Sequence, residues 1–162
     1  MKHILEAVIW NHYRSKKPRG FYNIIKGHTG VDLNYIFEPL PSPVTGQIVK
    51  ILEQKEMGKV IYLCDIASGS IHVFAHMKQV DVTEGQKVKR NQVLGITGNS
   101  GAKTTSAHLH YEIIVFKKPE KLLDRIMARS LATYKGWNTD PIMYLRELYG
   151  KYGFGPSGDL IT

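Results

Sequence analysis

Residues 60–76 read VIYLCDIASGSIHVFAH and contain two β-rich runs, Val60–Asp65 and Ile71–His76, on either side of a glycine-containing turn. Branched and aromatic apolar residues dominate both runs, and two such runs joined by a short turn are typical of neighbouring antiparallel strands. Similar runs lie on both sides of this stretch, at Gln47–Ile51, Gln92–Thr97 and His108–Phe116. The sequence therefore predicts a mostly β fold, built as a small antiparallel sheet or sandwich.

The chain before and after these runs is expected to form loops and helices. Three prolines in Glu38–Pro43 lack a backbone donor, which excludes a central strand and predicts a loop leading into Val44. Pro119–Leu131 has apolar residues at helical spacing, and Asp140–Tyr149 begins with an N-cap aspartate followed by proline. We therefore expect two C-terminal helices beside the sheet.

The length of 162 residues suits one domain with a single hydrophobic core. We expect its core at about residues 20–116, a helical extension at about 117–150 and a loose, glycine-rich tail at 151–162. One cysteine, Cys64, excludes an internal disulfide framework and is expected to be a buried small hydrophobe. No apolar stretch is long enough for a membrane span, and the first ten residues lack the features of a signal peptide.

The composition gives the chain a positive charge. Lys and Arg number 22 against 14 Asp and Glu, a net charge of +8, which favours polyanionic partners such as nucleic acid, acidic membrane or anionic cell wall. The basic residues are scattered, apart from Arg14–Arg19 and Lys87–Arg90, and no aromatic-interleaved nucleic-acid motif is present. We interpret the charge as solvated surface charge and expect no nucleic-acid partner.

Two histidines lie two residues apart in the last β-rich run. A strand projects residues i and i+2 to the same face, so His108 and His110 are expected to point into one site while Leu109 and Tyr111 face the other way. Sheets often build metal or acid/base sites in this way. The His-x-His pattern is short, and alone it does not identify a metal site.

A second cluster is Gly27-His-Thr-Gly-Val-Asp32. An extended backbone here places His28, Gly30 and Asp32 on one face, and an imidazole and a carboxylate are both acceptable zinc ligands. The alternative is a glycine turn with Asp32 capping the local backbone. Combined with one histidine of the last run, the cluster gives the three protein ligands of a catalytic zinc site. A fourth position is then open for water, whose pKa zinc lowers from about 15.7 to about 7.

A third cluster supplies candidates for proton transfer. His72, Phe74 and His76 are expected to share one face of the run that begins at Ile71. From the residues alone, either histidine can serve as the proton shuttle or lie on the surface.

Five motifs follow one another in order: His28-x-x-x-Asp32, Val73-Phe-Ala-His76-Met, Val82-Thr-Glu-Gly-Gln-Lys-Val88, Val93-Leu-Gly-Ile-Thr-Gly98 and His108-x-His110-Tyr-Glu. Together they resemble the LytM and lysostaphin-like zinc endopeptidases, the M23 peptidase family, over roughly Tyr22 to Val115. The resemblance implies a small antiparallel β fold, similar to a duplicated hybrid motif, with a narrow groove. It also implies one zinc ion per chain, a peptidoglycan peptide as substrate and metal-activated water as nucleophile.

The resemblance also implies a role for each site residue. His28, Asp32 and His110 are the implied zinc ligands. His108 is the implied general base, and His76 is implied to stabilise the charge on the scissile carbonyl oxygen. Tyr22, six residues before the first ligand, matches a tyrosine that contacts the transition state in some members, although it also suits aromatic packing at the groove edge.

Three stretches depart from the family pattern. The turn Asn99–Ala107 is longer by about one residue and ends in alanine in place of a common proline, and Pro39–Gly46 is compressed. The helical segment from Pro119 to Tyr149 exceeds the family minimum. These loops are expected to line the groove, so the substrate preference, including the bond that is cut, stays open.

Other readings of the same residues remain. One is a catalytically inactive relative that binds or activates at the cell wall, and another is a phosphocarrier of the glucose phosphotransferase type, which also pairs two histidines on a β architecture. The wall lies outside the cytoplasm, so an extracellular or periplasmic site of action is expected, with phage delivery, as for an endolysin, or release by lysis as the route. A monomer is expected, and anionic wall polymers suit its charge.

Overall fold

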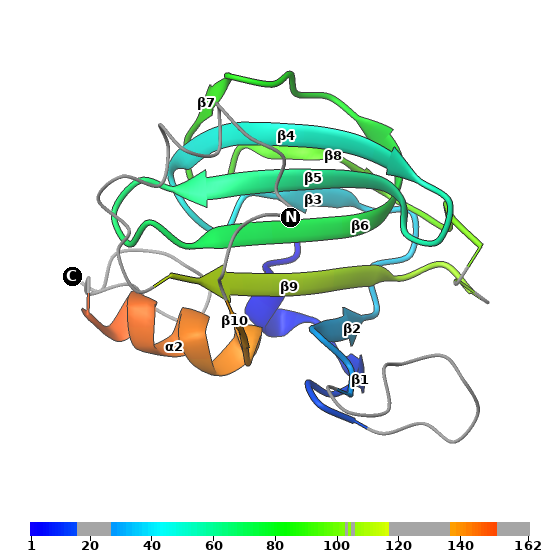
Figure 1. The fold of residues 1–162 in the computed structure, drawn as a ribbon, viewed down its shortest axis with the longest axis horizontal. Coiled ribbons are helices and arrows are strands. Elements are labelled where there is room, and N and C mark those ends of the chain that lie inside the picture. Colours follow the sequence, from blue (N-terminus) through cyan, green and yellow to red (C-terminus); the bar gives the residue numbers. More distant parts are fainter. Residues whose placement is uncertain (16–26, 103, 105, 117–136, 152–162) are drawn as a thin grey trace.

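The computed structural model describes residues 1–15, 27–102, 104, 106–116 and 137–151. These residues form one antiparallel β architecture, with a short 3-10 helix and an α-helix on the same side of it (Figure 1). In chain order the elements are η1 (Ile4–Glu6), β1 (Ile9–Asn11), β2 (Val31–Leu33), β3 (Pro39–Pro41), β4 (Gly46–Gln54), β5 (Gly58–Asp65), β6 (Ile71–Val80), β7 (Lys87–Val88), β8 (Val93–Thr97), β9 (Leu109–Val115), β10 (Trp137–Thr139) and α2 (Pro141–Lys151).

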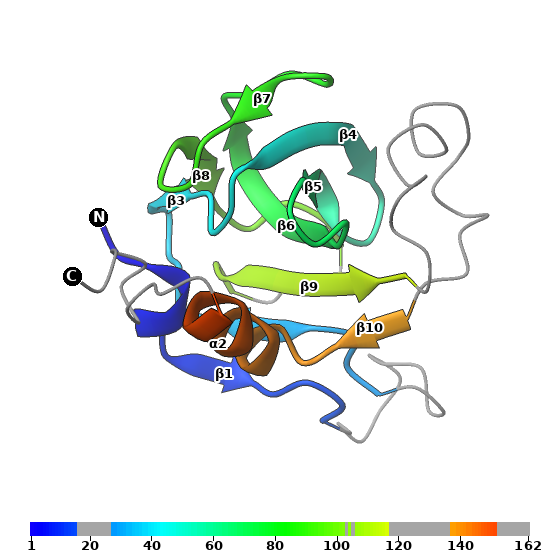
Figure 2. The same ribbon diagram turned by 90° about the vertical axis from the view of Figure 1, so that its left-hand side faces the viewer.

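Most strands pair in the order β1-β2-β9-β6-β5-β4-β7. β10 adds to β9, while β8 joins β3 to β6, and all of these pairs are antiparallel. Figure 2 shows β4, β5, β6 and β8 curled around one end, with β9 between them and the layer of β1, β10 and α2. The predicted antiparallel β fold is confirmed, and each of the five predicted strands is present with bounds that differ by at most four residues.

The central strands contain long apolar runs because both of their faces are covered. Ile61, Leu63 and Phe74 belong to the main core, which continues to β9 and α2. Val73 and Cys64 lie in a second buried cluster on the other face. A short uninterrupted apolar run is what a strand buried on two sides requires. The expected burial of Cys64 is confirmed, and burial raises the pKa of its thiol to about 12.

The proline-rich stretch differs from the prediction, because it is a short strand, β3, and not a loop. Among the described residues β3 pairs with β8 alone, so the prediction that this stretch is not a central strand is confirmed. The backbone of Glu38 and Ser42 bonds toward the β8 side, through Thr97 N–H to Glu38 O at 3.0 Å and Ser42 N–H to Gln92 O at 2.8 Å. Backbone groups alternate along a strand, so Pro39 and Pro41 turn their nitrogens away from β8, where no donor is needed.

The second predicted helix is confirmed. Asp140 caps it, since its Oδ1 accepts hydrogen bonds from the backbone N–H groups of Ile142 and Met143 at 2.9 and 3.3 Å. Leu145 and Tyr149 of α2 pack into the main core. The helix runs through Lys151, one residue into the predicted tail. The predicted helix Pro119–Leu131 and residues 152–162 lie outside the described residues.

Within the described part of the chain, no helix combines the length and apolar character needed to cross a membrane.

Candidate metal and catalytic site

Two neighbouring strands place the first and last histidine motifs together. β2 pairs with β9 in a register that sets Asp32 directly opposite His110. The segment from His28 to Asp32 is not one extended run as predicted, because the chain bends at Thr29 and Gly30 before β2 begins. This bend, and not the alternation of side chains along a strand, brings the ring of His28 next to Asp32 and His110.

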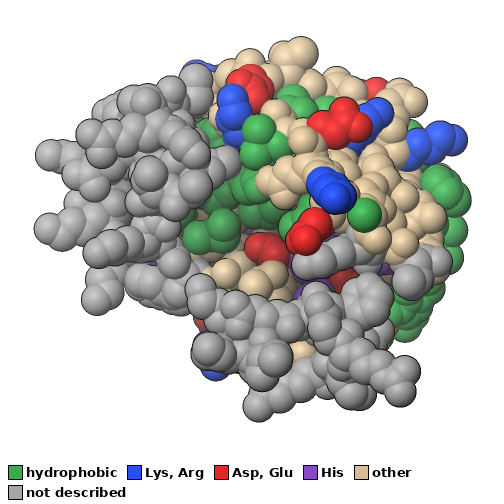
Figure 3. Space-filling model, turned by 45° about the vertical axis from the view of Figure 1, so that its right-hand side comes forward, with side chains coloured by type: hydrophobic (Ala, Val, Ile, Leu, Met, Phe, Trp, Pro, Cys, Tyr) green, Lys and Arg blue, Asp and Glu red, His purple; other side chains and the backbone are tan. Residues whose placement is uncertain are grey.

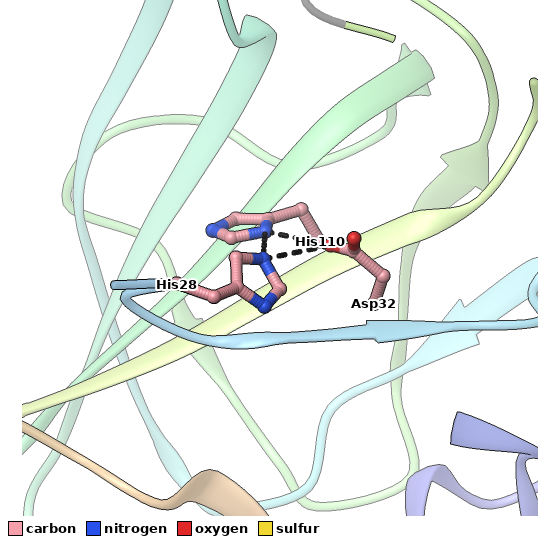
Figure 4. A group of neighbouring side chains, drawn as sticks. All are labelled: His28, Asp32 and His110. Carbon is pink, nitrogen blue, oxygen red and sulfur yellow. Dashed lines mark hydrogen bonds and ion pairs between the residues drawn. The ribbon is translucent and has the colours of Figure 1, made fainter. Parts of the chain in front are cut away.

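Three possible metal-ligand atoms, one each from His28, Asp32 and His110, lie close together (Figure 4). His28 Nε2 lies 3.0 Å from His110 Nδ1 and 3.1 Å from Asp32 Oδ1, and His110 Nδ1 lies 2.9 Å from Asp32 Oδ1. All three side chains are buried. Ligands about 2.0–2.1 Å from a tetrahedral zinc ion are separated by about 3.3 Å, so the three atoms need to move apart by only about 0.3 Å.

Hydrogen-bond partners on the outer side of the two histidine rings determine which ring nitrogen carries the proton. His28 Nδ1 faces the carbonyl of His12 at 3.2 Å, and His110 Nε2 faces Glu112 Oε1 at 2.8 Å. Both partners are acceptors, so in the neutral rings these outer nitrogens carry the protons and the inner nitrogens carry lone pairs. With Asp32 Oδ1, three lone pairs therefore meet at one buried point, an arrangement that suits a cation.

The electrostatics of the site favour positive charge at the same point. Burial alone raises the pKa of Asp32, but hydrogen bonds from His110 and His28 outweigh it and hold the pKa well below its usual range. Burial alone lowers the pKa of His110, but hydrogen bonds to the Asp32 and Glu112 carboxylates raise it to about 9. Either a proton or a metal ion can supply the positive charge that the site favours.

His108 lies beside the three converging side chains. Its Nδ1 donates to the Ser106 carbonyl at 2.8 Å, which leaves a lone pair on Nε2, 3.6 Å from Asp32 Oδ1. The side chains of Leu109 and Tyr111 lie in the core, so the predicted division of the strand into two faces is confirmed. His108 is placed to accept a proton from a molecule held at the centre.

His76 reaches the site through an irregularity in β6. Ile61 pairs with Phe74 while Lys59 pairs with Met77, so β6 carries one extra residue, and His76 has a left-handed φ of 61°. The bulge turns the ring toward His108 and His110, with ring centroids 4.8 and 6.1 Å away. The prediction that His72, Phe74 and His76 share one face is therefore wrong for His76.

His72 belongs to the core and not to the site. Its Nδ1 lies 2.7 Å from the Tyr111 hydroxyl, its Nε2 lies 3.2 Å from the Ser70 hydroxyl, and the residue is fully buried. Burial lowers the pKa of His72 to about 3, so it stays neutral. The other proton-transfer candidate, His76, also has a pKa lowered by burial, to about 4.

Several residues around the site were not predicted. Glu112 continues the face of His108 and His110 and was recognisable by the i+2 spacing. Asn11, which donates to Asp32 Oδ2 at 2.6 Å, and Trp10, whose ring centroid lies 6.5 Å from that of His108, come from β1, for which the sequence held no signal. Tyr22 lies outside the described residues.

Figure 3 shows acidic and histidine side chains at the bottom of a recess in one face.

Fold and site together define an antiparallel β protein in which two histidines and one aspartate converge and could hold a metal ion. The model of peptidase family M23 matches residues 26–122, which is more than half of the chain. The chain belongs to peptidase family M23.

Curated relatives agree with this assignment, and solved structures share the fold. The chain is 31% identical over 117 residues to the peptidoglycan DD-endopeptidase ShyA of Vibrio cholerae, covering 68% of this chain and 26% of ShyA. It spans about a quarter of the length of the curated relatives it matches first. The catalytic domain of lysostaphin from Staphylococcus simulans shares the fold, with a TM-score of 0.67, 24% identity and coverage of 90% of this chain and 99% of that one. A zinc containing peptidase from Vibrio cholerae matches with a TM-score of 0.55 and 25% identity, over 65% of this chain and 32% of that one.

Gly30 provides a stability test of the site's scaffold. A Cβ at Gly30 meets the Tyr111 carbonyl oxygen at 2.2 Å, whereas nothing lies within 4 Å of a Cβ at Gly150 in α2. We expect Gly30→Ala to lower the free energy of unfolding by about 3 kcal/mol or more, because backbone of β9 must move. Gly150→Ala should raise it by up to about 1 kcal/mol, since alanine favours the helix. Urea unfolding measures both, and equal stabilities for the two variants would contradict the close approach at Gly30.

Proposed function

We propose that this chain is a zinc-dependent endopeptidase that hydrolyses peptide bonds in the cross-links or stem peptides of bacterial peptidoglycan. The observation that carries the proposal is the convergence of three lone pairs from His28, Asp32 and His110 on one buried point, with His108 beside it. Membership of peptidase family M23 and relatives named as peptidoglycan DD-endopeptidases support the reaction and the substrate class.

His28, Asp32 and His110 would hold the metal. Two imidazole nitrogens and one carboxylate oxygen are the donors that catalytic zinc sites use, and three protein ligands leave a position for water. When bound, zinc lowers the pKa of that water to about 7 and polarises the scissile carbonyl.

His108 would act as the general base. Its Nδ1 proton is held by the Ser106 carbonyl, so the Nε2 lone pair faces the centre and can accept a proton from water there. The imidazolium that forms lies next to the Asp32 carboxylate, which stabilises its charge. The same proton is then available for the leaving amine.

His76 would stabilise the oxygen of the scissile carbonyl. Its Nδ1 donates to the Ser100 carbonyl at 2.8 Å, so it can donate from Nε2 only when the ring carries a second proton. Burial lowers the pKa of His76 to about 4, so this second proton would have to come from solvent and be favoured by the negative charge that develops on the carbonyl oxygen. Tyr22, six residues before His28, remains the candidate for a further hydrogen bond to this oxygen.

The substrate places the enzyme at the bacterial cell wall. The net charge of +8 suits anionic wall polymers at that location. Delivery by a phage or release by lysis, and a monomeric state, remain predictions.

Metal content and hydrolysis, measured on one preparation, test the proposal. We expect about one zinc per chain, loss of turbidity of purified peptidoglycan, inhibition by a chelator and recovery when zinc is added back. Mass spectrometry of the soluble fragments then identifies the bond that is cut.

Two outcomes would replace the proposal with another reading. Zinc binding without cleavage of peptidoglycans from several wall types would point to an inactive wall-binding module. Absence of both zinc and cleavage, with phosphorylation of a histidine by a phosphodonor, would point to a phosphocarrier.

A further inference from the structure

Two carboxylates next to the proposed metal site are held from outside by asparagines. Asn11 Nδ2 donates to Asp32 Oδ2 at 2.6 Å, and Asn138 Nδ2 donates to Glu112 Oε2 at 2.9 Å. In each carboxylate the other oxygen faces the site, Asp32 Oδ1 at the centre and Glu112 Oε1 at His110 Nε2. Each asparagine therefore fixes the rotation of a carboxyl group whose remaining oxygen acts on the site.

Both asparagines come from outside the region that matches the family. That region spans residues 26–122, whereas Asn11 lies in β1 and Asn138 in β10. β1 pairs with β2 and sets Asn11 opposite Asp32, and β10 pairs with β9 and sets Asn138 opposite Ile114. β1 and β10, which lie before and after the matched region, thus border the two strands that carry Asp32 and His110.

The pleat of β9 explains how Asn138 reaches Glu112. His110, Glu112 and Ile114 lie on one face of the strand because side chains alternate. Asn138, opposite Ile114, is the diagonal neighbour of Glu112, a spacing that long side chains bridge. Asn138 is itself anchored, since its carbonyl accepts a hydrogen bond from the Tyr13 hydroxyl at 2.6 Å.

Glu112 has further contacts that make its orientation matter. Its side chain is 13% exposed, and Oε1 also accepts a hydrogen bond from the Thr29 hydroxyl, next to His28. A carboxylate that holds the outer nitrogen of a metal-binding histidine sets the tautomer and the angle of the ring. If Oε2 loses its partner, the carboxyl group can rotate and the ring of His110 is less firmly held.

We infer that Asn11 and Asn138 are positioning residues for the metal site, acting through Asp32 and Glu112 respectively, so that β1 and β10 raise the affinity of this chain for zinc. The inference rests on the proposed metal site but not on hydrolysis of any substrate.

Zinc affinity, measured on the full chain by competition with a chromophoric chelator, tests the inference. We expect Asn11→Ala and Asn138→Ala each to weaken zinc binding about tenfold, and Glu112→Gln to weaken it by about 10–100-fold. Thr139→Ala in β10 and Asn34→Ala, which removes an acceptor of the Val8 N–H and Lys2 ammonium away from the site, are the controls and should change affinity less than about twofold. Circular dichroism confirms that each variant is folded at the temperature of the titration.

A double-mutant cycle separates positioning from a general loss of stability. If Asn138 acts through Glu112, Asn138→Ala has little further effect on zinc affinity in the Glu112→Gln background. Wild-type affinity in folded Asn138→Ala, an equal loss in Thr139→Ala, or a full additional loss in Glu112→Gln would overturn the inference, as would a wild-type chain that binds no zinc. A wild-type chain that binds zinc but leaves peptidoglycan intact would refute only the proposed function.

Discussion

His110→Ala is expected to lose both zinc binding and hydrolysis of peptidoglycan. Each of the three converging residues lies about 3 Å from both of the others, and His110 also reaches Glu112. Four-ligand zinc sites bind with about 10–16 kcal/mol, so one ligand is worth roughly 3 kcal/mol, or more than a hundredfold in affinity. Zinc content by elemental analysis and turbidity assays measure the two losses.

An exposed histidine provides the matched control for this variant. The His12 side chain is exposed, and only its backbone carbonyl contacts His28, so His12→Ala should keep full zinc content and activity. Retained hydrolysis in His110→Ala would refute the assigned ligand set. Asp32→Ala should repeat the loss seen in His110→Ala.

His108→Ala is expected to keep zinc and to lose activity by about 10²–10⁴-fold, the usual contribution of a general base. Its Nε2 lies 3.6 Å from Asp32 Oδ1, outside the set of three atoms that converge at about 3 Å, so removal of the ring leaves the metal ligands intact. The kcat of the variant should recover in part when imidazole is added, because a free base can enter the space left by the ring.

The comparison of His108→Ala with His110→Ala separates a base from a ligand. Loss of zinc from His108→Ala would make His108 a ligand, and an unchanged kcat would exclude it as the base. Rescue by imidazole is expected only in His108→Ala, since a variant without zinc has no activated water to deprotonate.

The strands that could be predicted are those with a strong local pattern. β5 and β6 contain long apolar runs because both of their faces are covered, and such runs are visible in the sequence. β1 and β10 have three residues each, and their pairing joins segments that are distant along the chain. A three-residue segment holds too little pattern to reveal its partner. For the same reason the roles of Asn11 and Asn138 could not be foreseen.

The site could be predicted where residue spacing and strand alternation agree. Asp32 and His110 meet because β2 and β9 are neighbours, and His108 follows from the i+2 spacing. His76 shows where the rule fails, since the bulge in β6 reverses the alternation after Phe74. An extra residue in one strand is defined only by its partner strand, so the sequence of β6 alone does not show it.

The two prolines of β3 have a consequence for how chains meet one another. Pro39 and Pro41 direct their nitrogens away from β8, and within the described residues no other strand pairs with β3. A strand from a second molecule would find no N–H donors from these two residues, so sheets cannot readily extend across this border. Pro39 is the exposed residue of β3, so its missing N–H hinders strand addition at this border, and replacing it with valine would favour such addition.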